Sequence, residues 1–157
     1  MEESLFLTLE SLHLVGVVLF LGTVIVSAWW KLSADRTGDA KVIAFAQGQV
    51  AGADLRLTLV GIVLIAVGGP INAILQGLPF SLFWVALAMG LFGASVVIWL
   101  AVMIPLQRRL CRMAADFGGA GIIPQEYWAM ERRWMTFCVL SMAFALSVIP
   151  IMVFKPD

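Results

Sequence analysis

The sequence predicts an all-α protein, a four-span transmembrane helix bundle with cytoplasmic helical extensions, and three observations indicate this fold class. The 157-residue chain is 62% hydrophobic and only 13% charged, whereas soluble domains usually carry about 25% charged residues. Four apolar stretches are long enough for the ~20-residue helix that crosses a bilayer core. Nine of the ten Lys and Arg residues lie in only two of the connecting segments.

One domain, residues 1–157, accounts for this length, because four spans leave little chain for a separate soluble domain. The net charge of zero argues against nucleic acid as a partner. The two cysteines, Cys111 and Cys138, lack metal-ligand spacing and are expected to be reduced thiols. The first apolar stretch is too long for a signal peptide and is expected to be a retained span.

The spans are expected at residues 5–30, 57–75, 82–106 and 134–154. The connecting segments on the basic side are predicted to be helical. Asp39 is suited to cap a helix over residues 39–54 that runs into the second span. Residues 107–117 extend the third span, a glycine-rich stretch at 118–121 ends that extension, and Pro124 begins a new helix.

Orientation follows from the basic residues, because Lys and Arg are retained on the cytoplasmic side of a membrane. Both basic segments are therefore expected in the cytoplasm and both termini outside. Tryptophan favours the two membrane interfaces. Trp29, Trp30 and Trp134 are accordingly expected at the inner interface, and Trp84 at the outer one.

His13, the only histidine, is the main chemical lead. Ionisable groups within a membrane face the bundle interior or a cavity. Glu10 lies three residues earlier on the same helical face, and Gly16 leaves room for a flat ligand or a close helix. Three interpretations stay open for His13: a structural histidine, a heme or metal ligand, and a proton relay with Glu10.

Heme iron bound by His13 needs a second axial ligand or stays five-coordinate. Met89 of the third span lies at similar depth and is the candidate, although methionine in a span is more often a packing residue. Asn72, also in the outer half, joins His13 in predicting a pocket on the outer side.

The sequence lacks a phosphate-binding loop, a GxSxG motif and an HExxH motif. Catalytic residues are therefore unknown, and whether the protein is an enzyme stays open. The lipid bilayer is the expected partner. Small residues spaced by four in the third span also permit a homo-oligomer or a membrane-protein partner. They are Ala86, Gly90 and Ala94.

Several short motifs together resemble a family of predicted bacterial four-helix integral membrane proteins of unknown function. They occur at residues 12–16, 20–22, 28–32, 34–36, 42–47, 105–110 and 131–134, and so cover almost the whole chain. The resemblance implies a multi-pass protein of the bacterial inner (plasma) membrane.

More distantly, the first span is similar to HemJ-type protoporphyrinogen oxidases and copper-resistance D membrane proteins. These share a four-helix core with a first-span histidine, which in HemJ-type proteins is implicated in heme or porphyrin binding. The resemblance implies the same role for His13. HemJ-type enzymes also rely on an intramembrane lysine, whereas Lys31 of this chain is expected at an interface.

Three functions are therefore considered. The first is a small membrane protein that binds heme or a tetrapyrrole through His13. The second is a non-enzymatic accessory or structural membrane protein that binds a partner protein. The third is a HemJ-like protoporphyrinogen oxidase.

Overall fold

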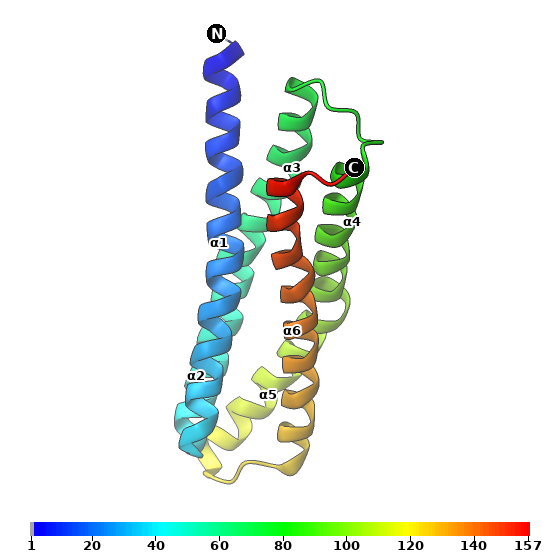
Figure 1. Ribbon diagram of the computed structural model, residues 1–157. Coiled ribbons are helices and arrows are strands. Elements are labelled where there is room, and N and C mark those ends of the chain that lie inside the picture. Colours follow the sequence, from blue (N-terminus) through cyan, green and yellow to red (C-terminus); the bar gives the residue numbers. More distant parts are fainter. Residues whose placement is uncertain (1) are drawn as a thin grey trace.

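The computed structural model describes residues 2–157 and is built from helices (Figure 1). In chain order these are α1 (Glu2–Thr37), α2 (Ala40–Ala53), η1 (Asp54–Thr58), α3 (Leu59–Leu75), α4 (Phe83–Ile98), η2 (Trp99–Met103), α5 (Ile104–Ala120) and α6 (Gln125–Phe154). Within residues 2–157 there is no strand. The all-α prediction is confirmed.

The elements η1 and η2 are single π-helical turns that join neighbouring α-helices without a break. The chain therefore forms four long helices, at Glu3–Thr37, Ala40–Leu75, Phe83–Ala120 and Gln125–Phe154, each long and apolar enough to cross a membrane. The shortest has 30 residues, or about 45 Å at 1.5 Å per residue. Each helix thus exceeds a hydrocarbon core of ~30 Å.

The two ends of the bundle differ. The N-terminus, the C-terminus and the α3–α4 turn lie at one end, and the α1–α2 and α5–α6 connections lie at the other (Figure 1). The second end carries the two basic segments and is called the basic end below. The first is called the terminal end. The segments predicted to be helical on the basic side are α2, α5 and the first part of α6.

Local signals set the helix boundaries at the basic end. The Asp39 carboxylate accepts hydrogen bonds from the backbone N–H groups of Lys41, at 2.8 Å, and Val42, at 3.3 Å. It therefore caps α2 as predicted. The helix α5 ends before Gly121, whose φ of 78° lies in the left-handed region that glycine adopts at low cost. Pro124 directly precedes α6.

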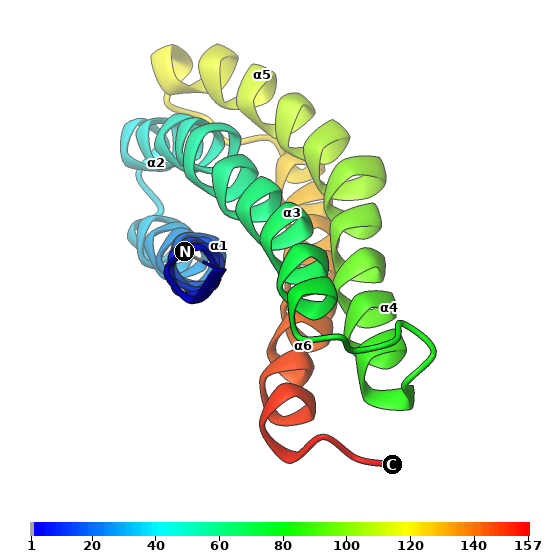
Figure 2. The ribbon, with the colours of Figure 1, turned by 90° about the horizontal axis from the view of Figure 1, so that it is seen from above.

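The α-helical segments pack in pairs: α1 along α3, α4 along α6, and α2 along α5 (Figure 2). Glycine lets α1 and α3 approach closely. A Cβ atom on Gly61 would lie 2.8 Å from the Gly16 carbonyl oxygen and 2.8 Å from the Phe20 backbone nitrogen. Only hydrogen fits at Gly61, so the two backbones are in direct contact there.

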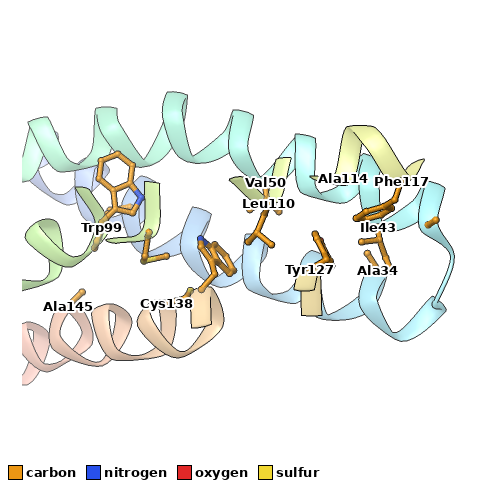
Figure 3. Close-up of a cluster of buried hydrophobic side chains, with 14 of the residues drawn as sticks. Ala34, Ile43, Val50, Trp99, Leu110, Ala114, Phe117, Tyr127, Cys138 and Ala145 are labelled. Carbon is orange, nitrogen blue, oxygen red and sulfur yellow. The ribbon is translucent and has the colours of Figure 1, made fainter. Parts of the chain in front are cut away.

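A buried seam follows the helices from the middle of the bundle to the basic end (Figure 3). Its members recur at three- and four-residue spacing, as in a helix packed on one face. On α2, η1 and α3 they include Ile43, Gln47, Val50, Asp54, Thr58 and Ile62; on α4, η2 and α5 they include Ser95, Trp99, Met103, Gln107 and Leu110; on α6 they include Tyr127, Glu131, Trp134, Cys138 and Ser141.

One interfacial expectation is wrong in part. Trp29 and Trp30 are 63% and 50% exposed, which suits side chains at a membrane interface. Trp134, in contrast, is only 2% exposed. It occupies a seam position of α6, so it packs inside the protein and not against lipid.

Candidate functional site

His13 lies in the terminal half of the bundle, where α1 packs on α3. Its half-buried side chain rests against two glycines that directly precede Pro70, with Gly69 beside the ring and Gly68 beside the Cβ atom. A Cβ atom on Gly69 would lie 3.2 Å from Cε1 and 3.5 Å from Nδ1 of the imidazole. A Cβ atom on Gly68 would lie 3.2 Å from the His13 Cβ atom. The glycines thus form a recess that holds the ring.

The Nδ1 atom of His13 is buried, and it has no hydrogen-bond partner among residues 2–157. The same holds, within this described range, for Oδ1 of Asn72, one helical turn beyond Gly68 on α3. Buried polar atoms are usually paired, so each unpaired one calls for an explanation.

Three further residues were expected at the site with His13, namely Glu10, Gly16 and Met89. Glu10 is exposed and forms no ion pair or hydrogen bond with His13 within the described part of the chain. The space beside Gly16 is filled by α3, because a Cβ atom there would lie 2.7 Å from the Leu64 Cβ atom. Of its two expected uses, Gly16 therefore serves the close helix. Met89 is 46% exposed on α4.

A cluster of charged groups that the sequence did not predict lies at the basic end. Lys31 of α1 is fully buried. Its Nζ atom lies 3.1 Å from Asp35 Oδ1 and 3.4 Å from Glu131 Oε2 of α6, and it donates a hydrogen bond to the Tyr127 hydroxyl. Burying charge costs free energy unless the charge is paired, and here one cation is shared by two carboxylates.

The carboxylate of Glu131 is only partly satisfied. It is close enough to Lys31 for an ion pair, yet the geometry between them is not that of a hydrogen bond. Neither of its oxygens has a hydrogen-bond partner within residues 2–157. Glu131 therefore has spare capacity to bind a proton or another donor.

The cluster continues onto α2 and α5. The Tyr127 hydroxyl donates to Gln47 Oε1 at 3.3 Å, and Gln47 Nε2 lies 3.7 Å from Cys111 Sγ. The Cys111 thiol in turn donates to the Gln47 carbonyl oxygen at 3.6 Å. Polar contacts thus join α1, α2, α5 and α6, and with them all four long helices, at this end.

A second polar group lies beside the π-helical turns. Gln107 donates to Asp54 Oδ2 at 3.0 Å, and Thr58 donates to Asp54 Oδ1 at 3.3 Å. A cavity of about 380 Å³ adjoins them, and we call it the π-turn cavity. Its lining includes Asp54, Leu55, Trp99, Gln107, Arg108 and Arg112.

The position of this cavity differs from the expectation of a pocket in the outer half. Neither His13 nor Asn72 lines it. A shallow hollow near the N-terminus is lined by α1 residues alone and does not include His13 either. Because π-helical turns occur frequently at functional sites, the meeting of η1 and η2 at one cavity makes it a second candidate site.

Sequence reasoning missed Lys31, Asp54 and Glu131 as buried groups. The available signal was their spacing. Asp54 lies four residues after the seam residue Val50, and Glu131 lies between the seam residues Tyr127 and Trp134. The part of the chain that the structure describes contains no group of three His, Cys, Asp or Glu residues suited to a metal ion.

The sequence matches the family described as "Predicted integral membrane protein (DUF2269)" over residues 7–156. No curated protein matches the chain significantly. No solved structure does so either. The similarity to HemJ-type and copper-resistance D proteins therefore stays a prediction.

Proposed function

Because the chain belongs to this family of integral membrane proteins, we propose that it binds heme or another tetrapyrrole within the bilayer, with His13 as axial ligand. The observation that carries the proposal is the position of the only histidine, half-buried on an apolar span with its Nδ1 atom buried against α3. We further propose that the membrane is a bacterial inner membrane and that the basic end faces the cytoplasm.

The residues around His13 fit such a ligand in two respects. The recess at Gly68 and Gly69 fixes the imidazole ring on α3. A ligating histidine commonly turns one ring nitrogen to the protein and the other to the metal. Here Nδ1 faces α3, so Nε2 would be the nitrogen that binds iron. Leu12 and Leu14 beside it on α1 are 44% and 57% exposed, so they offer apolar surface to a macrocycle.

Heme, when bound, would supply the iron chemistry. The protein would supply one neutral imidazole and an apolar surface. Met89 remains the candidate second ligand within one chain, and its exposure on α4 leaves the thioether accessible. If Met89 is not the ligand, the iron is five-coordinate or takes a ligand from another chain.

Absorption spectroscopy tests the proposal. The protein is expressed with ample heme, purified in detergent, and examined for a Soret band and for extractable heme. His13→Ala should abolish or strongly shift the spectrum while the protein stays inserted, and Val26→Ala, at an exposed position 13 residues further along α1, serves as the control. A wild-type protein that purifies colourless, with no extractable heme, would contradict the proposal. It would favour the alternative function of an accessory protein that binds a partner protein.

Two further measurements refine the site. Ligation requires neutral imidazole, so heme affinity should weaken on acidification. Met89→Ala should alter the spectrum only if Met89 is the second ligand.

The HemJ-like oxidase hypothesis gains no support from the geometry. The hypothesis requires a lysine within the membrane, whereas Lys31 is buried in the cluster at the basic end. Lys31 also follows His13 by 18 positions on one helix, which is about 27 Å at 1.5 Å per residue. A single porphyrin ring does not reach both side chains. Protoporphyrinogen turnover by the purified protein would be needed to revive the hypothesis.

A further inference from the structure

The π-turn cavity lies where the apolar spans meet the basic segments. Leu57 begins the second apolar stretch and Leu106 ends the third. Asp54 and Gln107 stand just outside these limits and hydrogen-bond to each other beside the cavity. A cavity at this level lies where lipid headgroups are found, and basic pockets between membrane helices are known to bind such headgroups.

The charges around the cavity favour an anion that also carries hydrogen-bond donors. Arg108 and Arg112 are exposed, lie one turn apart on α5, and both line the cavity. Asp54, which is buried, lines it as well. Two guanidinium groups and one carboxylate give the site a net charge of about +1 when all are ionised, which a monoanion complements.

An unpaired donor supplies an independent observation. Trp99 is 3% exposed, and its Nε1 atom is buried without a hydrogen-bond partner in the described residues. An indole N–H is a donor only, so the missing partner is an acceptor. Because Trp99 lines the cavity, an oxygen of a bound ligand would satisfy it.

One wall of the cavity is apolar and continues onto the surface of the helices. Leu55 lines the cavity and is 59% exposed, and Ile104 also lines it. A ligand in the cavity therefore has a polar end against Asp54 and the arginines and an apolar end toward the lipid-facing surface. A soluble phosphate compound has no acyl chain to pack against that apolar wall, whereas a phospholipid has.

We propose that the π-turn cavity binds the headgroup of an anionic glycerophospholipid, of which phosphatidylglycerol fits best. The phosphate lies against Arg108 and Arg112, and the glycerol hydroxyls donate to Asp54. An ester carbonyl accepts from the Trp99 N–H, and the acyl chains run along Leu55. This proposal does not depend on heme binding at the other end of the bundle.

Native mass spectrometry of the full-length protein in detergent tests this site. The protein is titrated with phosphatidylglycerol and with phosphatidylcholine that has the same acyl chains. The wild type should retain phosphatidylglycerol preferentially. The double variant Arg108→Gln/Arg112→Gln should weaken its binding by about tenfold or more, a change that corresponds to 1.4 kcal/mol. The matched control is Arg132→Gln/Arg133→Gln, two exposed arginines at the same end.

A second variant guards against a folding defect. Trp99→Phe removes the N–H donor without changing charge, and it should also lower the retention of phosphatidylglycerol. Equal retention of the two lipids by the wild type overturns the proposal. Equal loss in both arginine pairs overturns it too, because it indicates diffuse attraction to the basic end. Displacement of the lipid by soluble glycerol phosphate at matched concentration would assign the site to a soluble phosphate compound instead.

Discussion

Lys31 of α1 and Glu131 of α6 form a buried ion pair, with Nζ of the first 3.4 Å from Oε2 of the second. The pair connects the first and last helices of the bundle at the basic end. Asp35 shares the same ammonium group at 3.1 Å. Lys31 is therefore the only cation that balances two carboxylates in this cluster of described residues, and its loss affects both.

Lys31→Met should destabilise the protein strongly, because it leaves Asp35 and Glu131 without their cation. Removing one partner of a buried pair typically costs ~3–5 kcal/mol. Glu131→Gln should cost less, since Lys31 keeps Asp35. Lys41→Met, at an exposed position, is the control and should change stability little. Denaturant unfolding in detergent measures all three, and equal stability of the two lysine variants would contradict the prediction.

Gly61→Ala should destabilise the α1–α3 contact. The new Cβ atom would lie 2.8 Å from backbone atoms of α1, so the helices must separate. Overpacking of this kind costs ~1–3 kcal/mol. Gly22→Ala is the matched control, since nothing lies within 4 Å of a Cβ atom there. A shift in unfolding midpoint for Gly61→Ala no larger than for Gly22→Ala would show that the helices are not in direct contact.

The hydrogen bond between Ser95 of α4 and Ser141 of α6 should contribute weakly. The two hydroxyls are 2.8 Å apart and buried, and Ser141 also lies 3.1 Å from the Ser95 carbonyl oxygen. Coupling energies between membrane helices average ~0.6 kcal/mol in double-mutant cycles. A cycle of Ser95→Ala, Ser141→Ala and the double variant should give a value of this size. Zero coupling would indicate that the hydroxyls do not meet.

Reporter fusions should place both termini outside the cytoplasm and the Gly118–Gly121 stretch inside it. The reason is the concentration of Lys and Arg at the basic end. The structure requires that the C-terminus and the α5–α6 connection lie at opposite ends of the bundle (Figure 1). Fusions at Asp157 and at Gly119 should therefore give opposite signals, and a cytoplasmic Asp157 would reverse the proposed orientation.

Local and periodic features of the fold were predictable from the sequence. Asp39 indicated the start of α2, and four apolar stretches indicated four spans, because capping and hydrophobic length are read within one segment. The partners of Lys31 were not predictable in the same way, since Glu131 and Tyr127 approach it only through the packing of α6 on α1. Lys31 also follows two exposed tryptophans, so its sequence neighbours indicated an interface.

The same contrast between features of one segment and contacts between segments applies to the candidate sites. His13 was identifiable from the sequence because it is a polar residue in an apolar span. That α3 fills the space beside Gly16 could be known only from the packing of α3 on α1. The π-turn cavity was not predictable, because it forms where two helices far apart in the sequence widen at the same level.

The π-helical turns explain how buried residues that follow one another by four stay on one face of the helix. Val50, Asp54, Thr58 and Ile62 are all buried and follow one another by four. On a 3.6-residue repeat each step of four drifts by about 40°, so three steps would carry the last residue about 120° away. The wider turn at η1 absorbs that drift, and η2 does the same for Ser95, Trp99, Met103 and Gln107.

The register of two long helices, Ala40–Leu75 and Phe83–Ala120, is thus reset about halfway along their length. Deleting one residue from η1 would leave 11 steps from Val50 to Ile62, about three turns of a regular α-helix, so the π turn would become α-helical with little rotation of the residues beyond it. Gly61 and Gly68 would then still face α1. The π turn is therefore the point at which this helix can lose one residue and keep its packing face.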